Sequence, residues 1–131
     1  PLVLMTHTKD AVLSFTDRGL CWQARPVGDG CIPIAPILDL LRSHNPALNL
    51  SIELHPRTYD LPIFDPSWLA FFPDLTPSSL ASVVRLAVDC ERRFSDGSIP
   101  RPPAVEAIPW PDRAEAWIAR SASFLRSLLN P

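Results

Sequence analysis

The pattern of apolar and polar residues divides the chain into short strand-like runs and longer segments with a helical apolar stripe. Residues 2–6 form a nearly continuous apolar run, which is typical of a strand buried on both faces of a parallel sheet. Residues 48–54 form a second strand-like run, in which polar and apolar residues alternate. Between the two runs we expect a long loop as far as Pro33, followed by an amphipathic helix. The apolar positions that predict this helix by their spacing are Ile34, Ile37, Leu38 and Leu41.

The second half of the chain is predicted to be mainly helical. An irregular stretch with a short helical turn about residues 68–72 comes first. Thr76 followed by Pro77 then predicts a helix start, because a hydroxyl caps the free N–H groups and proline is tolerated in the first turn. Gly97 predicts the end of this helix. A proline-rich connector over residues 100–111 leads to a last helix. Its apolar residues are Trp117, Ile118, Phe124, Leu125, Leu128 and Leu129.

The order of these elements predicts an α/β fold. Strands that alternate with helices indicate a parallel sheet. Two strands do not make a stable sheet by themselves, so the pattern predicts further strands before residue 1.

Composition and charge narrow the classes of function. The chain has 131 residues, of which 47% are hydrophobic and 20% charged, which is not the composition of a disordered protein. A net charge of −2 gives no electrostatic reason to expect nucleic acid or an anionic membrane as partner. Cys21, Cys31 and Cys90 are too scattered for a disulfide framework or a zinc pair. No apolar run reaches the roughly 20 residues of a transmembrane helix. We therefore expect a cytoplasmic protein without nucleic-acid or membrane partners.

Two candidate metal ligands follow the two predicted strands. In parallel α/β folds, ligands bind beyond the carboxyl ends of the strands. His7 ends the first strand and Glu53 lies near the end of the second. An imidazole and a carboxylate on neighbouring strands are able to share Mn²⁺, Mg²⁺, Co²⁺ or Zn²⁺. Catalytic metals usually have three or four ligands, so a hydrogen-bonded pair without metal remains the alternative.

Several short motifs resemble one enzyme family. Residues 7–10, His-Thr-Lys-Asp, resemble the "H-x-K-D" that ends the seventh strand in sugar phosphate isomerases/epimerases of the xylose-isomerase-like superfamily. Residues 25–32 resemble the "R-x-x-G-E-G-x-h" loop of that family, residues 34–41 its next helix, and residues 50–53 its eighth strand. The resemblance covers about residues 2–90, and the order and spacing of the motifs make the combination specific.

This resemblance implies a fold and an activity. The fold would be the C-terminal part of a TIM (β/α)8 barrel, namely its last two βα units, with additional C-terminal helices. Residues 1–99 would form the partial barrel domain, and residues 100–131 a connector and a C-terminal helix that packs on the barrel. The activity would be that of a divalent-metal-dependent sugar or sugar-phosphate isomerase or epimerase of carbohydrate metabolism. Such an enzyme acts by proton transfer next to a carbonyl.

The same resemblance implies roles for individual residues. His7 would be a metal ligand, and Glu53 a metal ligand that also takes part catalytically in the proton transfer. Lys9 and Arg25 would bind the substrate, a small sugar or sugar phosphate. Asp10 would orient His7 or the neighbouring loop without touching the metal. The remaining two ligands of the family come from its fifth and sixth strands, so we expect the 131 residues alone to be inactive.

Other interpretations stay open at this stage. A lyase on the same barrel, such as a dehydroshikimate dehydratase, would use the same ligands. A catalytically inactive fragment or interaction module is a second alternative, and a homo-oligomer formed through the C-terminal helices is possible. A DNA-repair enzyme of the endonuclease IV type is disfavoured, because residues 17–19 read Asp-Arg-Gly where that family has Asp-Arg-His.

Overall fold

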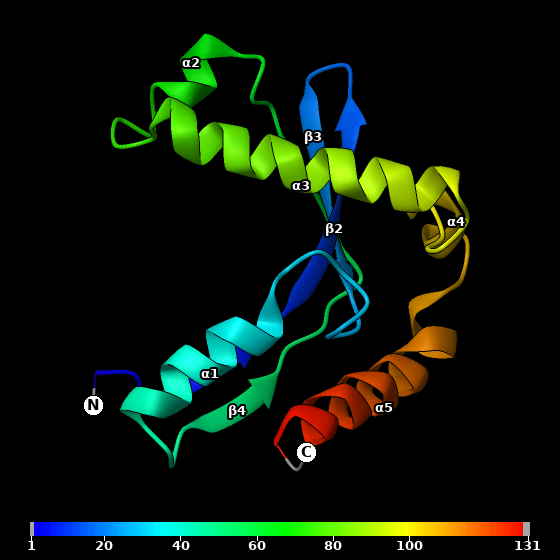
Figure 1. Cartoon of the computed structure of the whole chain (residues 1–131). Helices are drawn as coiled ribbons and strands as arrows, with labels where there is room; N and C mark the ends of the chain where they lie inside the picture. The colour runs from blue at the N-terminus through cyan, green and yellow to red at the C-terminus, as the bar shows by residue number, and fades with distance from the viewer. Residues whose placement is uncertain (1, 130–131) are drawn as a thin grey trace. The chain divides into compact units, whose positions relative to one another are not determined.

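The computed structural model describes residues 2–129 and has a mixed α/β architecture, as the sequence predicts (Figure 1). The elements in chain order are β1 (Met5–Thr8), β2 (Asp10–Thr16), β3 (Gly19–Arg25), α1 (Ile34–His44), β4 (Asn49–Ile52), β5 (Thr58–Leu61), α2 (Pro66–Leu69), α3 (Pro77–Ser95), α4 (Pro102–Glu106) and α5 (Trp110–Leu129). One sheet pairs β1 with β4, and the other has the order β2-β3-β5. Among the described helices, none combines the length and the apolar character that crossing a membrane requires.

The chain folds into two compact units. The first unit comprises the described residues up to Ala11, residues 24–56, and the residues from Ile108 onward. The second unit comprises Val12–Gln23 and Arg57–Ala107. Each unit is therefore assembled from segments that are distant in the sequence.

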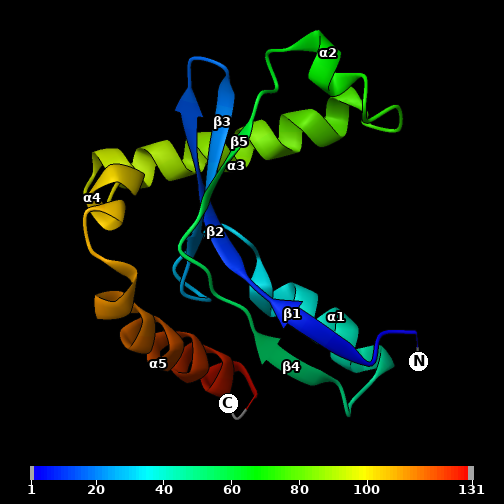
Figure 2. The same ribbon diagram turned by 180° about the vertical axis from the view of Figure 1, so that it is seen from behind.

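A parallel strand pair forms the centre of the first unit. Strands β1 and β4 lie side by side (Figure 2), with Met5 opposite Asn49 and Thr8 opposite Ile52. This confirms the parallel arrangement of the two predicted strands. The apolar stripes of α1 and α5 meet in one core with the side chains of β4. The core residues are Val27, Ile34, Leu38 and Leu125, with Leu50, Ile52, Phe124 and Leu128 packed against them.

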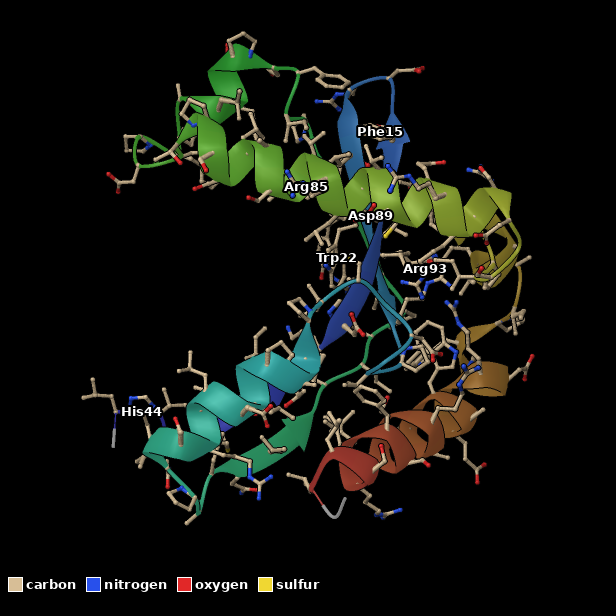
Figure 3. All side chains as sticks on the ribbon, viewed as in Figure 1. Phe15, Trp22, His44, Arg85, Asp89 and Arg93 are labelled. Atoms are coloured by element: carbon tan, nitrogen blue, oxygen red, sulfur yellow. The ribbon has the colours of Figure 1, made fainter. Side chains whose placement is uncertain are left out.

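The second unit is built on an antiparallel sheet. Strand β3 pairs with β5, with Leu20 opposite Leu61. Helix α3 crosses β2, the strand that carries Phe15 (Figure 3). The backbone N–H of Phe15 donates to the Glu91 carboxylate and that of Leu13 to Cys90 Sγ, so α3 satisfies N–H groups that β2 would otherwise expose at its edge.

The predicted long loop before Pro33 is wrong, because β2 and β3 form a hairpin there. Its strands are rich in β-branched, aromatic and other apolar residues, and Gly19 supplies a φ of 144° just after the turn. The predicted irregular stretch and connector also contain regular structure, namely β5 and α4. The prolines of the connector start α4, where a missing N–H costs nothing.

The three long helices confirm the predictions made from periodicity and capping. Thr76 accepts a hydrogen bond from the Ser79 N–H at the start of α3, and Gly97 has a φ of 76° just beyond its end. Helix α2 begins at Pro66 rather than near residue 68, because Asp65 caps it through the Ser67 N–H.

Candidate functional site

His7, Lys9 and Glu53 come together at the carboxyl ends of β1 and β4. The backbone N–H of Glu53 donates to the Thr8 carbonyl at 3.0 Å, which continues the parallel pairing past the end of β4. His7 and Lys9 stand two residues apart on an extended chain, so their side chains reach the same side. His7 Nδ1 lies 2.6 Å from Glu53 Oε2, and Lys9 Nζ lies 2.8 Å from Oε1. His7 of β1 and Lys9, just after β1, thus hold the Glu53 carboxylate, just after β4.

The Glu53 carboxylate has a basic partner at each of its two oxygens, and its pKa is lowered. The hydrogen bond from Lys9 lowers the pKa of Glu53 below its ordinary value of 4.5, and the charges of Lys9 and His7 add to this effect against the opposing effect of desolvation. Glu53 Oε2 is shielded from solvent and lies 2.6 Å from His7 Nδ1, and the hydrogen bond from His7 also lowers the pKa of Glu53. His7 is the most exposed of the three, with 63% of its side chain accessible.

Asp10 is the buried anchor beside this site. Its Oδ2 accepts hydrogen bonds from the N–H groups of Gly28 and Gly30, both at 2.9 Å. Its Oδ1 accepts from Ala11 at 2.8 Å and from Ile32 at 3.1 Å. Burial raises the pKa of Asp10, although the four N–H donors act in the opposite direction. One carboxylate therefore fixes the loop of residues 26–32 against the chain segment that carries His7 and Lys9.

Two glycines make this close approach possible. A Cβ at Gly30 would overlap Asp10 Oδ1 and the Ala11 carbonyl oxygen. Gly28 has a φ of 98°, and a Cβ there would lie 2.5 Å from the ring of Phe124. These positions explain the two glycines without any phosphate-binding role.

Helix α5 holds the other side of the same loop. Ser121 Oγ accepts the Val27 N–H at 2.9 Å and donates to the Trp117 carbonyl. Arg120 pairs with Asp29 at 2.7 Å. The sequence reasoning missed Ser121, yet a serine in the middle of an apolar helical stripe is a signal that could have indicated it.

The structure brings some of the predicted site residues together and places others apart from them. It brings His7, Lys9 and Glu53 together, and it directs Asp10 to the loop, which supplies three of its four hydrogen bonds, the fourth coming from the Ala11 N–H. Arg25 is buried, with 4% of its surface exposed. Its contact with substrate stays a prediction. Within residues 2–129, no group of three or more His, Cys, Asp or Glu side chains is close enough to hold a metal ion.

Comparisons with known proteins identified no relative of this chain. No protein-family model matches the chain, and neither a curated protein nor a solved structure gives a match. The resemblance to the xylose-isomerase-like superfamily stays a prediction.

Replacing Asp10 with alanine is expected to lower the free energy of unfolding by about 3 kcal/mol, because buried N–H groups lose their acceptor. The measurement is urea denaturation followed by circular dichroism. Asp39→Ala, at an exposed position of α1, is the control and is expected to change stability by less than about 0.5 kcal/mol. Equal effects of the two substitutions would contradict the anchoring role of Asp10.

Lys9→Met is expected to raise the pKa of Glu53 toward 4.5, because the ammonium that lowers it is removed. Since the folded-state pKa lies below the ordinary value, the contribution to stability is present above pH 4.5 and is lost as the pH falls through the lowered pKa. Carboxyl ¹³C NMR titration measures this pKa directly. Asp96, whose pKa is lowered mainly by a hydrogen bond from Ser98, is the internal control and should titrate unchanged. A Glu53 titration curve identical in the two proteins would contradict the prediction.

Proposed function

We propose that the first unit contributes His7 and Glu53 to a divalent-metal site of a sugar or sugar-phosphate isomerase or epimerase. The observation that carries the proposal is the meeting of these side chains at the shared carboxyl edge of β1 and β4. In parallel α/β folds this edge is where ligands bind. The fold that we propose for the complete site is the TIM barrel implied by the sequence resemblance, with β1 and β4 as neighbouring strands.

The donor atoms suit a divalent cation. The pKa of Glu53 is lowered, so its carboxylate is ionised at neutral pH, and an imidazole nitrogen of His7 lies 2.6 Å from Oε2. Imidazole and carboxylate are common ligands of Zn²⁺, Co²⁺ and Mn²⁺. The proposed site needs further ligands, because residues 2–129 supply no third His, Cys, Asp or Glu at this position. The resemblance implies that they are acidic residues on other strands.

The proposed reaction is proton transfer between carbons next to a carbonyl. A bound divalent cation would polarise the carbonyl and hydroxyl oxygens of the sugar. A carboxylate would take the proton from the hydroxyl-bearing carbon next to the carbonyl and return it to the former carbonyl carbon. The proton of the hydroxyl group passes to the former carbonyl oxygen in the same reaction, so that the carbonyl and the hydroxyl exchange places. The lowered pKa of Glu53 favours its role as ligand over its role as base, because an effective base has a pKa near the working pH.

One feature of the surroundings suits an anionic substrate group. His7 and Lys9 border an open pocket of about 240 Å³ between β1 and α1, whose other walls are mainly isoleucine and leucine side chains. Lys9 is 39% exposed, so its ammonium is accessible to an anionic group such as a phosphate.

Because this chain supplies two ligands, Mn²⁺ is expected to bind weakly at His7 and Glu53 and, at high Mn²⁺ concentration, to broaden the NMR signals of residues 7–9 and 53 selectively. The selectivity follows because paramagnetic relaxation falls steeply with distance. His7→Ala and Glu53→Ala should each weaken this binding at least about tenfold. His44→Ala is the matched control, since His44 lies at the C-terminal end of α1 (Figure 3), and it should bind as the unchanged protein does. Broadening that persists in Glu53→Ala, or that never concentrates on these residues, would refute the proposed metal site.

A further inference from the structure

Lys9 has an unusual position in this site. It is the only lysine in the sequence, and its ammonium lies 2.8 Å from Glu53 Oε1, one oxygen of the proposed metal-binding carboxylate. The other oxygen faces His7, the second proposed ligand, at 2.6 Å. The carboxylate therefore has a cation on one oxygen and a metal-ligating group on the other.

We infer that the Lys9 ammonium occupies the place of the divalent cation at Glu53 and is exchanged for the cation when the cation binds. This inference rests on the proposed function. A cation bound to Glu53 would bring two like charges close together at a partly exposed site, and their repulsion favours departure of the ammonium. Lys9 is thus a positioning residue, which holds the Glu53 carboxylate in place until the cation replaces it.

The surroundings of Lys9 allow this exchange. Its side chain is 39% exposed and lies on a long flexible stem, so the ammonium is able to move into solvent without disturbing the core. The backbone next to it stays fixed, because the Asp10 carboxylate holds four N–H groups. Once released, the ammonium is available to an anionic group of the substrate, which is the role that the sequence resemblance implies for Lys9.

The test is a Mn²⁺ titration of the unchanged chain, Lys9→Met and Lys9→Arg, with free Mn²⁺ measured by electron paramagnetic resonance. Removing the competing charge is expected to tighten Mn²⁺ binding by about fivefold in Lys9→Met, the scale of one partly exposed ion pair. Lys9→Arg keeps the charge and is expected to stay within about twofold of the unchanged chain. Circular dichroism checks that both variants keep the fold.

The outcomes separate this inference from the proposed function. If Mn²⁺ binding requires His7 and Glu53 but Lys9→Met binds no more tightly than the unchanged chain, the exchange is overturned and the metal site stands. If neither the unchanged chain nor Lys9→Met binds Mn²⁺ through His7 and Glu53, both are overturned. Binding that appears or tightens in Lys9→Met, and disappears when Glu53→Gln is added, supports the exchange.

A second measurement uses the single lysine as a reporter in case Lys9→Met unfolds. Reductive ¹³C-methylation keeps the positive charge of Lys9 and gives one dimethyl-lysine NMR signal. Mg²⁺ is not paramagnetic and does not broaden NMR signals. Adding Mg²⁺ is expected to move the chemical shift of the dimethyl-lysine signal toward its value in Glu53→Gln, where the ammonium has lost its charged partner. A Lys9 signal that stays unchanged at saturating Mg²⁺ would overturn the exchange.

Discussion

Parallel pairing of β1 with β4 is the constraint on which the candidate site depends. Parallel strands end at the same edge, so the residues that follow β1 and β4 are neighbours in space although more than forty positions separate them in the chain. The register places Thr8 opposite Ile52, and the next backbone hydrogen bond brings Glu53 beside residues 7–9. A slip of one residue would turn Glu53 to the opposite face of the sheet and separate it from His7 and Lys9.

Two carboxylates near the site, those of Asp10 and Glu53, differ in burial and therefore in role. Asp10 is almost fully buried and accepts hydrogen bonds from backbone N–H groups. These hydrogen bonds stabilise the loop of residues 26–32, which α5 contacts from the other side. Glu53 is partly exposed and binds side chains that are themselves accessible, so its partners are able to change. A rigid support next to exchangeable charged groups is an arrangement that suits ligand binding.

The sequence predicts the fold where the signal is local. The long helices follow from apolar spacing and from caps such as Thr76, and the proximity of His7 and Glu53 follows from the rule that parallel strands share an edge. The pairing of β3 with β5 was missed because Leu20 and Leu61 lie in distant segments. The β2-β3 hairpin is local, and the two mainly apolar runs on either side of Asp17, Arg18 and Gly19 were a signal that could have predicted it. The sequence did not determine whether Asp10 contacts His7 or the loop of residues 26–32. The fold, and not the motif itself, places the loop's N–H groups next to its carboxylate.

The central claim is that His7 and Glu53 bind a divalent cation at the shared edge of β1 and β4. Anomalous X-ray diffraction from crystals soaked in Mn²⁺ tests it most directly, because it locates the ion and the side chains together. An anomalous peak is expected within bonding distance of the His7 imidazole and the Glu53 carboxylate, with Lys9 Nζ moved away from Glu53 Oε1. Crystals that bind Mn²⁺ elsewhere, or that keep His7, Lys9 and Glu53 in mutual contact at saturating Mn²⁺, would contradict it.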